Sequence, residues 1–388
     1  MSAEAPFTEA GARPPAPFFP LDGLFKEAER ELTICNACRY CEGLCAVFPA
    51  LERRTLLSTQ DVTQLANLCH DCRACYDACM YAPPHEFALN LPKALAAVRV
   101  ADNRAYMWPS AAPRLLRGRL AAAVGIPLVA VILLAIAVAH AGLSALVATP
   151  SGAGSPYTLI PYPALLAVAG VPALFAIVVM VTGGWRFWKS GGGSPAPVSF
   201  GAIRQMATDA VTLRYLRGGG IGCYYEQDDE PSPVRRHLHW LVSGGFGLCL
   251  VSTIAAGVMQ DLAGIDPPYP VLSVPVITGL IGGIAMTIGC TALLFVKAGS
   301  SRDTTTEQMA VKDYALLTSL DVLAVTGLLV LLTRDTPAYA ILLIVHLVAV
   351  AFTFLSAPYS KFTHVIYRTL ALVRDNLEST ATAAHGQH

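Results

Sequence analysis

Apolar residues gather into long runs in the C-terminal part of the chain. A helix needs about 20 apolar residues to cross the hydrocarbon core of a bilayer. Six runs approach this length and predict transmembrane helices at Leu120–Val147, Ala164–Val181, Leu238–Val258, Val271–Val296, Tyr314–Thr333 and Ala338–Pro358. The second run is short and the fifth contains Asp321. A soluble domain does not bury so many uncharged runs, so the pattern indicates a membrane protein.

The basic residues between the runs predict the orientation. Sixteen of the seventeen lysines and arginines after residue 113 fall on one side of a six-helix arrangement, and only Arg334 falls on the other. Loops rich in lysine and arginine stay in the cytoplasm. We therefore expect a multi-pass protein of the cytoplasmic (inner) membrane with both termini in the cytoplasm. Residues 182–236 would form a cytoplasmic loop, and residues 376–388 a flexible C-terminal tail.

Composition agrees with this interpretation. Hydrophobic residues make up 54% of the chain and charged residues 14%, whereas soluble domains have about 25% charged residues. The 27 basic residues balance 27 acidic ones. A nucleic-acid-binding protein needs an excess of positive charge to neutralise phosphates, so we expect no nucleic-acid partner.

Eight of the eleven cysteines form two runs of identical spacing near the N-terminus. The first run is CNACRYCEGLC and the second is CHDCRACYDAC, and both follow C-x2-C-x2-C-x3-C. In two-cluster ferredoxins three cysteines of such a run hold one [4Fe–4S] cube and the fourth ligates the other. The spacing predicts one cluster on Cys35, Cys38, Cys41 and Cys79, and a second on Cys69, Cys72, Cys75 and Cys45.

Disulfides and structural zinc are the competing interpretations of these cysteines. Disulfides need an oxidising compartment, but the N-terminal stretch lacks the basic and apolar regions of a signal peptide. Structural zinc pairs two C-x2-C elements, which leaves two cysteines of each run surplus. The sequence thus predicts a mainly α protein: a helical ferredoxin-like domain with two [4Fe–4S] clusters at residues 1–113, and a six-helix, haem-binding membrane domain at residues 114–375.

Histidines near the ends of the apolar runs suggest a haem. His239 opens the third predicted helix, whereas His346 and His364 lie in the last apolar stretch, 18 residues apart. Five helical turns would place these two on one face, roughly 27 Å apart. In the predicted topology His239 and His364 share the cytoplasmic depth. One histidine from each of two helices at matching depth can hold a haem b iron from both faces, with propionate partners at Arg235, Arg236 and Arg368.

Other ionisable residues allow further interpretations. His346 has a depth similar to that of His140, so the two could hold a second haem, or His346 could line a quinone pocket. His237 is interpreted as an interface residue. Interfacial histidines can also simply hydrogen-bond at the lipid boundary. Asp321 either takes up protons at a quinone site or bonds to a neighbouring helix, because an unpaired carboxylate in a bilayer is costly.

Several segments together resemble the tricarballylate utilisation protein B family, also called citrate utilisation protein B. They are CNACRYCEGLCAVFPAL, LANLCHDCRACYDACMYAPPHEFALNLPKALA, LRYLRGGGIGCYYEQDDE, RRHLHW and PYSKFTHVIYR. The resemblance covers most of the chain. In this family a His–His pair often follows the double arginine, whereas here Trp240 follows His239.

The resemblance implies an electron-transfer role. Family members take electrons from an FAD-dependent partner that oxidises tricarballylate to cis-aconitate. They pass these electrons through iron–sulfur clusters and a b-type haem to the quinone pool. This chain has no FAD or nucleotide motif of its own, so the dehydrogenase site would belong to a partner on the cytoplasmic face. The alternatives are a heterodisulfide-reductase-like or glycolate-oxidase-like subunit with another donor, and a membrane redox sensor or transporter.

Overall fold

The computed structural model describes residues 21–109, 118–149, 151–191, 196–220, 222–224 and 230–385, and the structural statements concern these residues. The predicted domain boundary at residues 113/114 lies outside them. The N-terminal part holds α1 (Leu21–Cys38), α2 (Val47–Glu52), α3 (Thr59–Leu68), α4 (Ala74–Asp77) and α5 (Leu91–Tyr106). The structure is mainly helical, as the sequence predicts.

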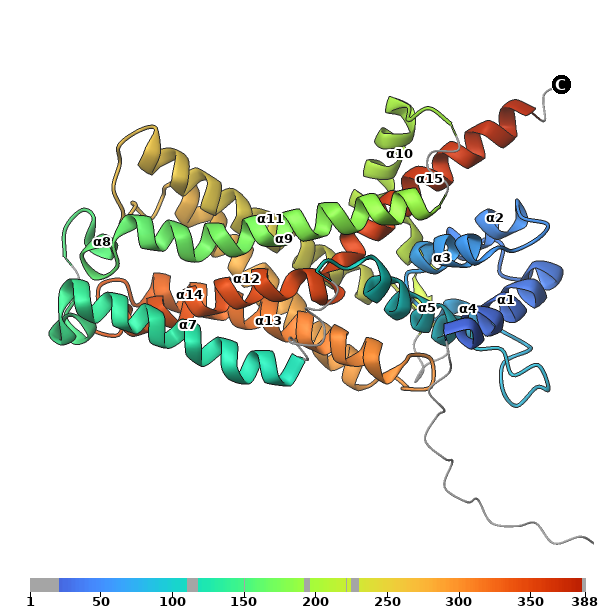
Figure 1. Cartoon of the computed structure of the whole chain (residues 1–388), viewed down its shortest axis with the longest axis horizontal. Helices are drawn as coiled ribbons and strands as arrows, with labels where there is room; N and C mark the ends of the chain where they lie inside the picture. The colour runs from blue at the N-terminus through green and yellow to red at the C-terminus, as the bar shows by residue number, and fades with distance from the viewer. Residues whose placement is uncertain are drawn as a thin grey trace, which may run out of the picture.

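Six helices are long and apolar enough to cross a membrane, which confirms the number expected from the sequence. They are α7 (Gly118–Ala141), α9 (Tyr162–Ser190), α11 (Val234–Asp261), α12 (Val274–Ala298), α13 (Glu307–Leu332) and α14 (Tyr339–Ser356). Figure 1 shows them running alongside one another, with α1–α5 gathered at one end. Large apolar side chains such as Phe295, 74% exposed, point away from the helices. Lipid rather than water suits such a surface.

Close backbone approach joins α11 to α12. A Cβ atom built on Gly245 would lie 2.7 Å from the carbonyl oxygen of Gly282, and one built on Gly282 would lie 2.7 Å from that of Gly245. Small residues at such positions let membrane helices pack backbone to backbone. Larger side chains here would force the two helices apart.

Several helix ends differ from the predicted ones. The first helix stops at Ala141 because Gly142 takes a positive φ of 83°, and a short η1 (Leu143–Val147) follows. The second helix, predicted as short, runs for 29 residues. Its end packs on a later helix: a Cβ built on Gly183 would lie 2.8 Å from the hydroxyl of Tyr367.

The stretch predicted to carry His346 and His364 on one helix is broken. α14 ends at Ser356, and the 3-10 turns η3 (Ala357–Tyr359) and η4 (Lys361–Thr363) precede α15 (His364–His385). Pro358 lacks the N–H that would continue the helix. His346 and His364 therefore lie on different helices, and the prediction that one helix carries both on a single face is wrong.

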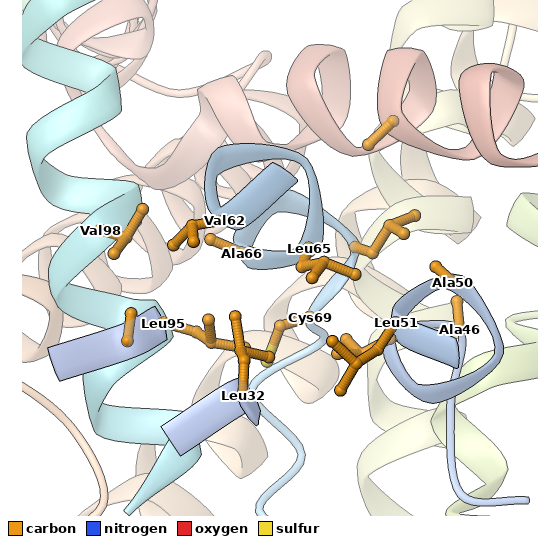
Figure 2. Packing of buried hydrophobic residues seen from close by; sticks show 14 of the residues in the cluster. Leu32, Ala46, Ala50, Leu51, Val62, Leu65, Ala66, Cys69, Leu95 and Val98 are labelled. Atoms are coloured by element: carbon orange, nitrogen blue, oxygen red, sulfur yellow. The ribbon is translucent and has the colours of Figure 1, made fainter. Parts of the chain in front are cut away.

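Helices α1, α2, α3 and α5 enclose the core of the cysteine domain. Ser58 begins α3 with a capping box: its hydroxyl accepts from the N–H of Asp61, whose carboxylate accepts from the N–H of Ser58. Figure 2 shows the apolar face of α3 surrounded by side chains of the other three helices. The buried residues labelled there include Leu32, Leu51, Val62, Leu65, Ala66, Leu95 and Val98.

Helix α15 joins the cysteine domain to the membrane helices. Tyr367, Ala371 and Leu372 of α15 belong to the same buried cluster as α3, and so does Phe187 of α9. The side-chain amide of Gln64 donates to the carbonyl of Ala371 at 2.8 Å. α15 extends to His385, so residues 376–385 are helical, whereas the sequence predicted a flexible tail.

The remaining short elements lie between and beside the long helices. α8 (Ser155–Leu159) precedes α9, and α10 (Phe200–Val211) packs on α15. η2 (Arg214–Arg217) leads to a two-stranded antiparallel pair, β1 (Cys223–Tyr224) and β2 (Pro231–Ser232). The loop predicted at residues 182–236 is therefore shorter than expected, because α9 continues to Ser190 and α11 already begins at Val234.

Candidate functional site

The first three cysteines of the first run and the last cysteine of the second run line one cavity. Its walls include Cys35, Cys38, Cys41 and Cys79, together with Cys75. Cys35 and Cys38 lie in the last turn of α1, three residues apart, and therefore on one face of that helix. The cavity has an empty volume of about 470 Å³ and is partly open, and Cys38 is exposed.

A second cavity adjoins the first and shares Phe48, Cys75 and Leu91 with it. Cys45, Cys69, Cys72 and Cys75 line it, together with His70. Cys69 and Cys72 are buried. The fourth cysteine of each run thus lies with the other run, which is the grouping that the spacing predicts. Ligation of iron by the two groups stays a prediction.

Unusual backbone angles bring the second run together. Cys69 caps the C-terminal end of α3 in an extended conformation. Asp71 and Arg73 then take positive φ values of 55° and 69°, which are uncommon for residues with a side chain. Arg39, in the first run, has φ of 55°. In the resulting turn the backbone N–H of Asp71 points at the sulfur of Cys69, with N and Sγ 3.4 Å apart. Such N–H groups can stabilise a ligating thiolate.

The thiols of each group are hard to ionise unless a cation is bound. Burial and the neighbouring Cys41, Cys79 and Cys38 together raise the pKa of Cys35 to about 12. Burial and the neighbours Cys72 and Cys69 also raise the pKa of Cys45. Metal binding offsets this cost because its positive charge stabilises the thiolates.

The cysteine groups fit a cluster better than a single ion. Among the described residues, no three His, Cys, Asp or Glu side chains are placed to hold one metal ion. A single zinc would need its sulfurs about 2.3 Å away, whereas a four-iron cube holds its four thiolates apart. Four cysteines spread around one cavity match the wider spacing that a four-iron cube requires.

Two of the three predicted haem ligands lie side by side. The ring centroids of His239 and His364 are 6.4 Å apart, and the ring planes are perpendicular (89°). An imidazole nitrogen lies about 2.0 Å from a bound metal, so two rings on opposite sides of one iron have centroids about 6 Å apart. The separation of the two rings fits an iron between them.

The hydrogen bonds of the pair also suit ligation. The Nδ1 of His364 lies 2.6 Å from the carbonyl oxygen of Lys361, so it donates and leaves Nε2 with a free lone pair. Burial and the neighbouring Arg368 and His239 together lower the pKa of His364 to about 3. The ring is therefore neutral, as a ligand must be. The Nδ1 of His239 is buried and makes no hydrogen bond within the described part of the chain.

His346 lies apart from this pair. It packs against Gly327 of α13, and its Nδ1 lies 3.0 Å from the hydroxyl of Thr326, which donates to the carbonyl of Val322. His140, its predicted companion, is exposed on α7. Among the described residues, the rings of His140 and His346 make no contact with each other. A second haem on His346 stays a prediction.

Arginines of two helices hold the second cysteine loop against the membrane domain. Arg235 of α11 donates to the carbonyls of Cys72 and Asp71, at 3.2 and 3.3 Å. Arg368 of α15 donates to the carbonyl of Cys69. We expected these arginines to face haem propionates, but the structure directs them to the cysteine loop. Arg236 instead lies over the ring of Trp240, 4.5 Å from its centroid.

His70, which was not predicted as a site residue, lies beside the second cysteine group and near His239. It lines the second cavity, and its Nδ1 is buried and makes no hydrogen bond in the described residues. Burial lowers the pKa of His70, and nearby Arg368 and His239 lower it further. Its position inside the CHDC motif was the available signal.

A buried ion network, also missed, lies beside the same loop. Asp313 of α13, 3% exposed, forms ion pairs with Lys297 of α12 and with Lys361. Lys361 also lies 3.8 Å from the carboxylate of Asp71. Since these contacts join distant segments, no local pattern indicates them. Deeper in the helices, Thr291 donates to Asp321, which matches the helix-bonding interpretation of that carboxylate.

Known proteins match both parts of the chain. Residues 28–105 match the family model described as the citrate utilization protein B Fer4-like domain, and residues 112–385 match the model described as citrate utilization protein B. Citrate utilization protein B of Escherichia coli is 39% identical over 353 residues, covering 91% of this chain and 92% of that relative. No solved structure matches the chain significantly. The Fer4-like match contains all eight cysteines of the two groups.

Proposed function

Because the chain belongs to the citrate utilization protein B family, we propose that it is the membrane electron-transfer subunit of a dehydrogenase. Its Fer4-like domain lies at one end of six helices that can span a membrane. The partner would be an FAD-dependent dehydrogenase on the cytoplasmic face, with tricarballylate as its substrate. The acceptor would be the membrane quinone pool.

One observation carries the proposal. The first cysteine cavity shares Cys75 with the second, and His70, which lines the second, lies near His239 of the histidine pair. Two [4Fe–4S] clusters and a b-type haem would supply single-electron carriers at these positions. Such carriers suit a protein that acts between a flavin and a quinone, because a flavin and a quinone can each exchange their two electrons one at a time.

Electrons would enter at the first cavity. Cys38 is an exposed member of the cysteine groups, whereas Cys69 and Cys72 are buried. Tyr40 and Met80, 66% and 60% exposed, lie at the rim of this cavity. Aromatic and methionine side chains are enriched at protein interfaces. A redox partner that covers this rim would reach the first cavity directly.

Electrons would leave at the histidine pair. The neutral ring of His364 is oriented by the carbonyl of Lys361, and Arg235 and Arg368 fix the second cysteine loop beside it. The second cysteine group and the histidine pair are thus held by residues of the same two helices, α11 and α15. The orientation with both termini in the cytoplasm rests on the distribution of basic residues.

Membrane vesicles that contain the chain and the flavoprotein test the proposal. We expect tricarballylate to drive quinone reduction in these vesicles. A Cys45→Ala variant should abolish the reaction, and a Cys249→Ala variant should retain it. Equal quinone reduction without the chain would contradict the proposal. Quinone reduction could instead require the chain but occur only with another flavoprotein and its substrate. That result would favour the heterodisulfide-reductase-like or glycolate-oxidase-like alternative over the tricarballylate donor.

A further inference from the structure

Arginines from three helices converge on the loop of the second cysteine group. Arg99 of α5, 7% exposed, donates to the carbonyls of Ala66 and Cys69, at 3.0 and 3.4 Å. Arg235 of α11 and Arg368 of α15, both half-buried, donate to carbonyls of the same loop. Three guanidinium groups that are far apart in the sequence thus meet at one short stretch of backbone.

The carboxylate of Asp71 offsets only part of this positive charge. Asp71 is 5% exposed and lies 3.7 Å from Arg99 and 3.8 Å from Lys361. Within the described part of the chain, Arg235 and Arg368 bind backbone carbonyls and form no ion pair. The second cysteine group therefore lies beside an excess of positive charge that is largely withdrawn from water.

The first cysteine group has different surroundings. Glu31, 3% exposed, lies one turn before Cys35 on the same face of α1. Its carboxylate accepts from the N–H of Asn90 at 3.1 Å, and burial raises its pKa to about 7. Arg39 donates to the carbonyl of Asn36 in this run, but it is exposed, and solvent screens exposed charges. An ionised Glu31 would lower the potential of a cluster here, and a protonated one would leave it unchanged.

We propose that Arg99, Arg235 and Arg368 raise the reduction potential of the second cluster above that of the first. The inference rests on the proposed function, because it requires a cluster at each cysteine group. Reduction adds one negative charge to a cluster, and nearby positive charge stabilises that state. Burial alone disfavours the more highly charged state, so the order of the two potentials depends on the arginines.

This order gives the electron transfer a direction. The first group includes the exposed Cys38, whereas Cys69 and Cys72 of the second group are buried. An electron that enters at the first cluster is more stable on the second. The three arginines therefore draw it away from the exposed partner surface and towards the helices that carry His239 and His364.

A redox titration of the purified full chain, followed by electron paramagnetic resonance, tests the proposal. The signal of the second cluster is the one that Cys45→Ser removes. In the wild type this signal should have the higher midpoint potential. Arg235→Gln and Arg368→Gln should each lower it and leave the first signal nearly unmoved. The expected shift is on the order of a tenfold change in the ratio of reduced to oxidised cluster, or about 59 mV for one electron.

Two further variants separate charge from packing. Arg235→Lys keeps the positive charge and should stay near the wild-type potential. Arg236→Gln is the matched control, because it removes the charge of the adjacent arginine, which lies over the ring of Trp240. It should leave both signals unmoved. Equal shifts in Arg235→Lys and Arg235→Gln would show that charge is not the cause and would overturn the inference.

The remaining outcomes distinguish this inference from the proposed function. A second cluster with a wild-type potential at or below that of the first would overturn the role of the arginines and leave the proposed function intact. Unmoved signals in both glutamine variants would do the same, and so would loss of the second signal in both, which would mean that the arginines only hold the loop. A wild-type chain without cluster iron would overturn both.

Discussion

The imidazole rings of His239 and His364 lie perpendicular to each other at a centroid separation of 6.4 Å, although they come from the N-terminal ends of two helices far apart in the sequence. Helix α15, which His364 opens, also packs through Ala371 on α3 of the cysteine domain. The helix that positions one ring of the pair therefore also anchors the second cysteine group. A displacement of the cysteine domain should therefore change the position of His364 relative to His239.

The exchange of the fourth cysteine between runs gives the first prediction. Cys79→Ser should remove the same cluster signal as Cys38→Ser, although the two residues belong to different runs, because both line the first cavity. Cys45→Ser should remove the other signal. Electron paramagnetic resonance of the reduced variants, with iron assayed per chain, measures this. Loss of one common signal in Cys45→Ser and Cys38→Ser would contradict the grouping.

The buried ion network gives the second prediction. Asp313→Asn should lower the free energy of unfolding by about 3 kcal/mol, because removal of one partner leaves buried charges uncompensated. Lys297 would lose its partner, whereas Lys361 would keep Asp71. Thermal melting in detergent measures the effect. Asp303→Asn, an exposed site in the nearby loop, is the control. Equal melting temperatures for the two variants would show that the network adds no stability.

Asp102 predicts a pH dependence of stability. Burial raises its pKa to about 7, against the hydrogen bonds from Thr63 and Asn67 and the charge of Arg99, which lower it. A raised pKa in the folded chain favours the protonated acid. Its stabilising contribution is therefore complete below the unfolded pKa of 3.8 and is lost as the pH rises through about 7.

Asp102→Asn removes this titration. Between pH 5 and pH 8 the wild type should lose on the order of 2 kcal/mol of stability relative to the variant. Melting temperatures of both proteins at the two pH values measure the difference, and comparison with the variant cancels the effects of other titrating groups. A difference that is constant with pH would mean that Asp102 is ionised throughout.

Local patterns in the sequence were enough to predict part of this architecture. Apolar run length predicts the six long helices, because each span is a property of one segment. Repeated cysteine spacing predicts the two groups, because three members of each group are close neighbours in the chain. The placement of His346 and His364 on one helix, however, required that helix to continue past Pro358, where the structure has two helices.

Contacts between distant segments could not be predicted in this way. Arg368 reaches Cys69, Lys361 joins Asp71 to Asp313, and Cys223 reaches Cys72 only after the helices have packed. None of these pairs has a fixed spacing that a sequence can reveal. The proximity of His239 and His364 was predicted from matching depth, not from the helix break that in fact places His364 at the start of α15.

A dithionite-reduced minus oxidised visible spectrum of the purified chain, with iron and haem assayed per chain, tests the central claim most directly. We predict b-type haem bands and about eight cluster irons. The bands should be lost in His239→Ala and His364→Ala and kept in His237→Ala, whose exposed ring lies beside Trp240. A second haem that is lost in His346→Ala would add His346 to the ligands. Cluster iron without haem, or bands that persist in both His239→Ala and His364→Ala, would contradict the account.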